Sequence, residues 1–229
     1  MDAENKEKFK QMTWKQKWGY FWDYHKWKVI IPILVFIFLY TFISDVIQEK
    51  RPAALSVAIV NANNISDMMM TITQEYPKEM GIDTEKTPVR MEADFLHPEV
   101  MGEAATVDNR TIASIQKYQA MIINAYIDVT VSPTWAVDEY QKTDVYEDLE
   151  QLLSKEFLEK HEDLLYYTKN KDGKQVAAGI RLDQTKLFGQ LYDGKVPIMT
   201  ICRYSKRKEE SVRFVEWIIE RECRKISDF

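Results

Sequence analysis

Residues 29–44 read VIIPILVFIFLYTFIS, a stretch without a single charged side chain. Asp45 follows, and two further apolar residues extend the stretch to position 47. A transmembrane helix needs about 20 mainly apolar residues to cross a hydrocarbon core about 30 Å thick. Pro32 falls in the first turn of such a span, where its missing N–H costs little. The stretch therefore predicts one transmembrane helix over residues 29–47.

A cleaved signal peptide and a buried core helix are the alternatives to an anchor. A signal peptide has a shorter apolar core, followed by small residues at its cleavage site. Residues 45–51 instead read DVIQEKR, and the first pair of small residues is Ala53 and Ala54. The 28 residues before the apolar stretch would also make a long leader. The sequence favours an uncleaved anchor.

Lysine and arginine residues are distributed unevenly around the span. Residues 1–28 contain seven Lys and four acidic residues, whereas the opposite flank has only Lys50 and Arg51 nearby. Positively charged flanks stay in the cytoplasm. We therefore expect a single-pass protein of the plasma (cytoplasmic) membrane, with its N-terminus in the cytoplasm and its C-terminal domain outside.

The cytoplasmic tail over residues 1–28 combines aromatic residues with lysine. Residues 13–16 read TWKQ, which fits a capping box that opens a helix. Indole rings favour the headgroup zone of a bilayer, and lysine favours anionic lipid. We expect an interfacial helix that contacts the lipid bilayer and runs into the span; a face that docks a partner protein is the alternative. The predicted membrane-interface residues are Trp14, Trp18, Phe21, Trp22 and Trp27.

The rest of the chain is acidic, because residues 45–229 hold 24 Lys or Arg against 32 Asp or Glu. Such a domain repels phosphate backbones, so we expect no nucleic-acid partner. The basic run from Arg203 to Lys208 is interpreted as a solvated helix start. Cys202 and Cys223 are expected on a strand and near the end of the following helix, roughly 25 Å apart. That distance argues against a disulfide.

Beyond a linker over residues 48–53, strand and helix patterns alternate. Residues 54–60 read ALSVAIV, an apolar and β-branched run typical of a buried strand. This alternation predicts a mainly parallel sheet flanked by helices. The further elements expected in this part are a helix from Ser66 that ends at Pro77 and Gly81, a strand over 89–96, a helix over 111–124 and a strand over 127–132.

The last third of the chain predicts a β-hairpin and a closing helix. Residues 170–174 read NKDGK, a strong turn signal between strands over 164–169 and 175–182. The other expected elements are a two-piece helix over 147–160 with Ser154 as a cap, a strand over 196–204, and a helix capped by Ser205. The expected fold is thus an α/β domain over residues 54–229.

Several segments resemble the type-II, Venus-flytrap class of extracellular solute-binding proteins. They are LSVAIVNAN (55–63), IQKYQAMIINAYIDVTVSP (115–133), DLEQLLSKEFLEKHEDLLYYT (148–168) and PIMTICRYSKRKEESVRFVEWI (197–218). The segment KQKWGYFWDYHKWKVI (15–30) is similar to the start of short anchored bacterial proteins, mostly uncharacterised, that carry such a domain. The resemblance implies a binding fold. The roughly 175 residues after the linker imply a reduced or single-lobed version.

The sequence offers little for catalysis or metal binding. It contains no G-x-S-x-G, H-E-x-x-H, P-loop, G-x-G-x-x-G or C-x-x-C motif. His161, Glu162 and Asp163 are adjacent at a helix end, where polar residues are usually solvated. Asp128 has no obvious second carboxylate for acid/base work. We expect no catalytic residue, no cofactor and no metal.

Ligands of open α/β sheets bind beyond the carboxyl ends of the strands. Amide and hydroxyl groups there can fix polar atoms, and Trp135 can stack on a sugar or close an apolar wall. The alternative is that the asparagines make turn and capping hydrogen bonds and that Trp135 belongs to the core. The candidate ligand-binding residues are Asn61, Asn63, Asn64, Ser132, Thr134 and Trp135.

Three classes of function are compatible with these patterns. The first is a membrane-anchored, solute-binding-like module that interacts without catalysis, for example with an envelope or transporter protein. The second is a working receptor that delivers a small polar solute to a transporter. The third comprises an unrecognised enzyme and a purely structural anchor. The sequence favours the first class.

Overall fold

The structure is a computed structural model that describes residues 13–49, 51–62, 65–98 and 108–224. The chain divides into two compact units, Met1–Arg51 and Pro52–Phe229. Each unit has its own architecture, and the boundary between them falls inside the predicted linker over residues 48–53.

The described part of the first unit forms a long helix, α2 (Trp14–Glu49). It begins as the capping box predicts, because the backbone N–H of Thr13 donates to Oε1 of Gln16 at 3.0 Å. Its segment Lys26–Ser44 has a mean hydropathy of 2.1, is 19 residues long and buries none of its side chains against protein. This helix is long and apolar enough to cross a membrane, a property that signal sequences near an N-terminus share.

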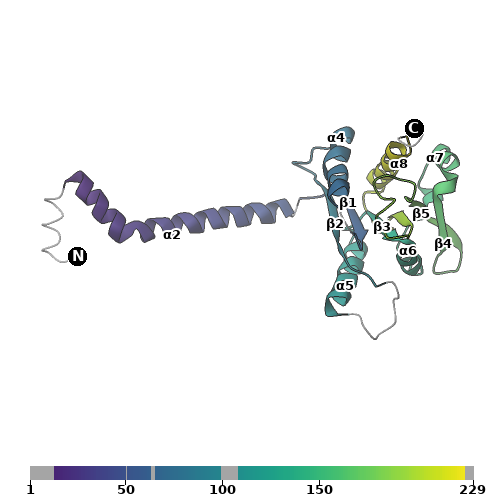
Figure 1. Cartoon of the computed structure of the whole chain (residues 1–229), viewed down its shortest axis with the longest axis horizontal. Helices are drawn as coiled ribbons and strands as arrows, with labels where there is room; N and C mark the ends of the chain where they lie inside the picture. The colour runs from purple at the N-terminus through teal and green to yellow at the C-terminus, as the bar shows by residue number, and fades with distance from the viewer. Residues whose placement is uncertain (1–12, 50, 63–64, 99–107, 225–229) are drawn as a thin grey trace. The chain divides into compact units, whose positions relative to one another are not determined.

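Pro32 lies in the interior of α2, because the helix starts at Trp14 and not at the apolar stretch. The prediction that Pro32 sits in a first helical turn is therefore wrong. A proline inside a helix deprives the carbonyl four residues earlier, here that of Lys28, of its hydrogen bond, and its ring clashes with that carbonyl. Figure 1 shows α2 bent between its N-terminal part and its apolar part.

The second unit is built on a six-stranded sheet with the order β2-β1-β3-β6-β5-β4. β1 pairs in parallel with both β2 and β3, as the alternating order predicts. The pairs β3–β6, β6–β5 and β5–β4 are antiparallel, so β5 runs in the same direction as β1, β2 and β3. The strands are β1 (Leu55–Val60), β2 (Val89–Phe95), β3 (Val129–Pro133), β4 (Leu165–Lys169), β5 (Gln175–Arg181) and β6 (Pro197–Ile201).

Helices cover both faces of this sheet (Figure 1). Successive side chains of a strand point to opposite faces, so Leu55, Val57 and Ile59 of β1 enter one core, and Ala58 and Val60 enter the other. The first core is closed by α3 (Ser66–Met70), η1 (Thr71–Glu75), α4 (Tyr76–Met80), η2 (Leu149–Gln151), α7 (Lys155–Lys160), η3 (Glu162–Leu164) and α8 (Lys208–Arg224). The second core is closed by α5 (Asn109–Ile123) and α6 (Thr134–Gln141).

The helix predicted to end at Pro77 and Gly81 continues through Pro77 to Met80 and stops at Gly81, which adopts a left-handed backbone conformation. Gly81 is therefore confirmed as its end, and Pro77 is not. The residues before Pro77 form a π-helical turn, η1, in which the N–H of Tyr76 reaches the carbonyl of Thr71. The wider turn lets the chain pass a residue that has no N–H to donate. Pro77 is thus accommodated within the helical segment.

Candidate functional site

The carboxyl ends of β1 and β3 open onto a pocket of about 290 Å³. From β1 the chain goes on to β2 on one side of it, and from β3 it goes on toward the other half of the sheet. Such a switch point between neighbouring parallel strands is where open α/β sheets bind their ligands. The lining residues are Asn61, His97, Pro133, Trp135, Tyr192, Asp193 and Lys195.

Asn61 joins the ends of β1 and β2 on one side of this pocket. Its side-chain N–H donates to the carbonyl of His97 at 2.8 Å, and its amide oxygen accepts from the N–H of His97 at 2.8 Å. The residue adopts a positive φ of 53°, a conformation in which Asn is enriched. Its amide group is therefore used for a structural turn, which was the alternative to ligand binding, although the residue also lines the pocket.

His97 is buried in the pocket wall, with 5% of its surface exposed. Its ring packs edge-on against Tyr118 at 4.8 Å, and Nδ1 lies 3.3 Å from the hydroxyl of Tyr140. Burial lowers the pKa of His97 to about 4, so the imidazole is neutral at pH 7. Among the described residues, Nε2 has no hydrogen-bond partner. The pocket wall therefore contains an uncharged imidazole ring packed against aromatic side chains. At pH 7 this ring does not carry the extra proton that a general acid would donate.

Tyr192 holds the two parallel strands together at the back of the pocket. Its hydroxyl lies 2.6 Å from the carbonyl of Val60 and 3.0 Å from the carbonyl of Val131, so it bridges β1 and β3. Burial raises the pKa of this hydroxyl well above its usual range. Asp193 and Lys195 follow it and bring both signs of charge to the pocket.

Two of the six predicted ligand-binding residues line the pocket, namely Asn61 and Trp135. Ser132 is fully buried in the core, where Tyr118 is its neighbour. Thr134 is half-buried at the start of α6 and is not among the lining residues. Asn63 and Asn64 lie outside the described residues.

The sequence did not predict α6, and therefore did not predict that Trp135 lies on a helix. Pro133 was taken as the end of a strand, but it is also the residue before the first turn of α6. Proline is well suited to a helix start, because its φ is fixed and its missing N–H is not needed there. Trp135 therefore lies on a helix that packs against the sheet, and this packing fixes the position of its backbone. His97 could have been found by applying the strand-end rule to β2 as well as to β1 and β3.

A second polar cluster lies at the opposite, amino-terminal ends of β1 and β3. The carboxylate of Asp128 is fully buried and accepts hydrogen bonds from the N–H of Ser56 at 2.8 Å and the hydroxyl of Ser205 at 2.5 Å. Arg207 completes the cluster through Nε and Nη2. Asp128 is thus saturated by donors, and its geometry is that of a structural ion pair rather than a catalytic acid.

The basic run from Arg203 to Lys208 is less solvated than predicted. Arg203 pairs with Asp144 at 3.2 Å, Arg207 with Asp128, and Lys208 with Glu147. These contacts tie the turn between β6 and α8 to the rest of the domain. His161 departs from its prediction in the same way, since it is buried, with its ring 4.7 Å from that of Phe157.

Metal ligands are not clustered in the part of the chain that the structure describes, where no group of three His, Cys, Asp or Glu side chains could hold an ion. No protein-family model, curated protein or solved structure matches this chain. The resemblance to solute-binding proteins therefore stays a prediction.

Proposed function

We propose that this protein is a single-pass membrane-anchored module whose extracytoplasmic domain binds a protein partner through the pocket at the ends of β1 and β3, without catalysis. Within the residues that the structure describes, one helix meets the length and hydropathy of a span. The lysine-rich flank before that helix argues for a cytoplasmic N-terminus. An envelope or transporter protein is the kind of partner that a domain tethered in this way would meet.

The observation that supports binding is the position of the pocket at the switch point between β1 and β3. A half-buried indole, Trp135, and two opposite charges, Asp193 and Lys195, surround a floor made rigid by Tyr192 and Asn61. Tryptophan is enriched among the residues that carry most of the binding energy at protein interfaces, because an aromatic anchor contributes a large contact area at little entropic cost. This combination favours recognition of a protein surface.

The shape of the pocket separates this proposal from a solute receptor. Small-molecule sites enclose most of their ligand in a volume of about 300–1,000 Å³. Here the pocket is at the lower limit, at about 290 Å³, and it belongs to one compact unit built on one sheet. A second lobe that could close over a solute is not found among the described residues. Capture of a small polar solute for a transporter is the second candidate.

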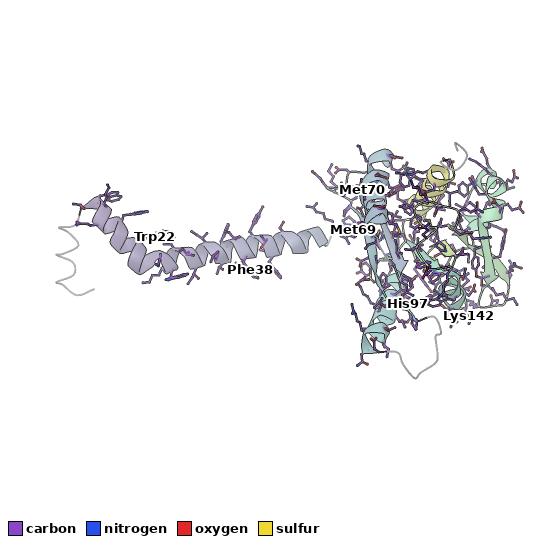
Figure 2. All side chains as sticks on the ribbon, in the orientation of Figure 1. Trp22, Phe38, Met69, Met70, His97 and Lys142 are labelled. Atoms are coloured by element: carbon purple, nitrogen blue, oxygen red, sulfur yellow. The ribbon has the colours of Figure 1, made fainter. Side chains whose placement is uncertain are left out.

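Site-specific photo-crosslinking from position 135 in cells tests the proposed interaction. A photoreactive amino acid in place of Trp135 should give one discrete adduct heavier than the chain. The matched control is Lys142, which follows the last residue of α6 and is exposed (Figure 2 labels it). A discrete adduct at 135 and none at 142 supports the proposal, whereas the same pattern at both positions contradicts it.

Thermal unfolding of residues 52–229 against sugars, amino acids, peptides and metals tests the second candidate. A ligand at 100 times its dissociation constant adds about 2.7 kcal/mol to the free energy of unfolding, which is a readily measured shift. A shift that disappears in Trp135→Ala would support a receptor. An unshifted domain would exclude the compounds tested.

A further inference from the structure

The N-terminal part of α2 has a definite aromatic face. Trp14, Trp18 and Trp22 are exposed to 80%, 61% and 48%, so about half or more of each side chain is accessible to the surroundings. At 100° per residue, spacings of four place the three indoles within about 80° of one another around the helix axis. Gln16, which is also exposed, lies about 160° from Trp18. The aromatic face is defined here as these three tryptophans.

Lysine residues border the aromatic face on both sides. By the same rotation, Lys26 and Lys28 lie about 80° from Trp18 in opposite directions, and Lys15 lies about 60° from it. None of these three lysines makes a salt bridge among those found in the described residues. A lysine at the edge of an apolar face can extend its ammonium group toward a charged surface while its stem covers the apolar ring. The pattern matches a helix that lies in the plane of a negatively charged interface.

The helix α2 is too long to lie entirely within the bilayer core, so its N-terminal part must lie outside it. A helix of 36 residues is about 54 Å long, whereas a hydrocarbon core is about 30 Å thick. The apolar segment Lys26–Ser44 accounts for the core, so the residues before it must lie outside. The bend in α2 separates the two parts, and Trp22 lies close to it (Figure 2). A bend at this point lets the first part turn from the membrane normal toward the membrane plane.

We propose that residues 14–25 of α2 form an in-plane helix that binds the headgroups of anionic phospholipids, with the aromatic face inserted and the lysines at its borders and at its junction with the span. This inference rests on the proposed membrane anchor. The aromatic face binds an anionic lipid surface rather than a protein, because this face is continuous with the apolar span and lysines lie along its borders. Such a segment fixes the depth and rotation of the span in the inner leaflet.

The test is spin labelling of the full chain in lipid vesicles. Trp18→Cys places a nitroxide on the aromatic face, and Gln16→Cys is the matched control on the opposite face. Both are made with Cys202→Ala and Cys223→Ala, and thermal unfolding confirms that the domain is folded in this background. Collisions with a water-soluble nickel chelate are compared in vesicles of phosphatidylcholine alone and with 30% phosphatidylglycerol. Carbonate extraction shows independently whether the chain spans the bilayer.

In vesicles with phosphatidylglycerol, the label at 18 should be several-fold less accessible to the chelate than the label at 16. This difference should shrink in phosphatidylcholine alone and at 0.5 M salt, since surface attraction is screened. Equal accessibility of both labels in a chain that resists carbonate would overturn the proposal and leave the anchor intact. If the difference in accessibility between the two labels is the same with and without phosphatidylglycerol, the proposed preference for anionic lipid is wrong. Release by carbonate would overturn the anchor itself.

Discussion

Arg207 reaches the fully buried carboxylate of Asp128 through two nitrogen atoms, Nε at 2.8 Å and Nη2 at 2.7 Å. Asp128 directly precedes β3, and Arg207 directly precedes α8. The pair thus ties the start of a central strand to the start of the helix that covers one face of the sheet. Because the carboxylate has no access to water, its charge must be balanced by these donors.

Asp128→Asn should destabilise the domain by about 3–5 kcal/mol, because it leaves the guanidinium of Arg207 without its counter-charge and turns an amide toward donors. Urea unfolding of residues 52–229 measures this loss. The control Glu139→Gln removes the exposed pair with Lys142 and should change the free energy of unfolding by less than about 0.5 kcal/mol. Equal effects of the two substitutions would contradict the structural role of Asp128.

As the pH falls, protonation of His97 should lower the free energy of unfolding of the domain before most carboxylates titrate. The pKa of His97 is about 4 in the folded state and near 6.5 when unfolded, so the unfolded chain binds the proton first. The contribution of His97 is complete above pH 6.5 and is lost as the pH falls toward 4, by up to about 3 kcal/mol.

The matched variant for this pH dependence is His97→Phe, which keeps a ring against Tyr118 and cannot titrate. The free energy of unfolding of His97→Phe should fall less steeply between pH 6.5 and 4 than that of the original domain. His161, whose pKa is also lowered, mainly by burial, stays common to both proteins. Identical slopes would show that His97 titrates normally in the folded domain.

Gly179 lies where β5 approaches β6 too closely for a side chain. A Cβ there would stand 2.4 Å from Cγ2 of Ile198 and 2.7 Å from the carbonyl oxygen of Met199. Gly179→Ala should therefore cost about 1–3 kcal/mol in thermal unfolding, because a backbone atom in a central pair cannot move aside.

The control for Gly179 is Gly173 in the hairpin turn, with a φ of 76° and open space around it. Gly173→Asn should be nearly neutral, since asparagine tolerates this conformation. A Gly179→Ala domain as stable as Gly173→Asn would mean that β5 and β6 are further apart than the structure places them.

The regular elements with strong periodic patterns could be predicted from the sequence. The apolar run of β1, the hairpin turn at Gly173 and the cap at Ser154, which accepts from the N–H of Phe157, were all predicted and confirmed. In each case the signal lies within a few residues, because it depends on local backbone conformation or on burial of one segment.

The features that sequence reasoning missed depend on contacts between distant segments. Asp128 pairs with Arg207, which lies 79 positions later in the sequence. The hydroxyl of Tyr192 donates to the carbonyl of Val60, which lies 132 positions earlier. Neither pairing leaves a pattern in the local sequence. The helix α6 was missed because Pro133 reads equally well as the end of a strand and as the start of a helix. Two of the seven residues that line the pocket, Asn61 and Trp135, were thus predicted from strand ends, and the other five required the folded domain.

The membrane-anchored arrangement is tested most directly by cysteine labelling in intact cells that produce the full chain. Asp172→Cys lies in the exposed hairpin turn and Gln16→Cys lies before the span; both are made with Cys202 and Cys223 replaced by alanine. A membrane-impermeant maleimide should label position 172 in intact cells and position 16 only after permeabilisation. Labelling of position 16 in intact cells, or of position 172 only after lysis, would contradict the proposed topology and the extracytoplasmic binding module built on it.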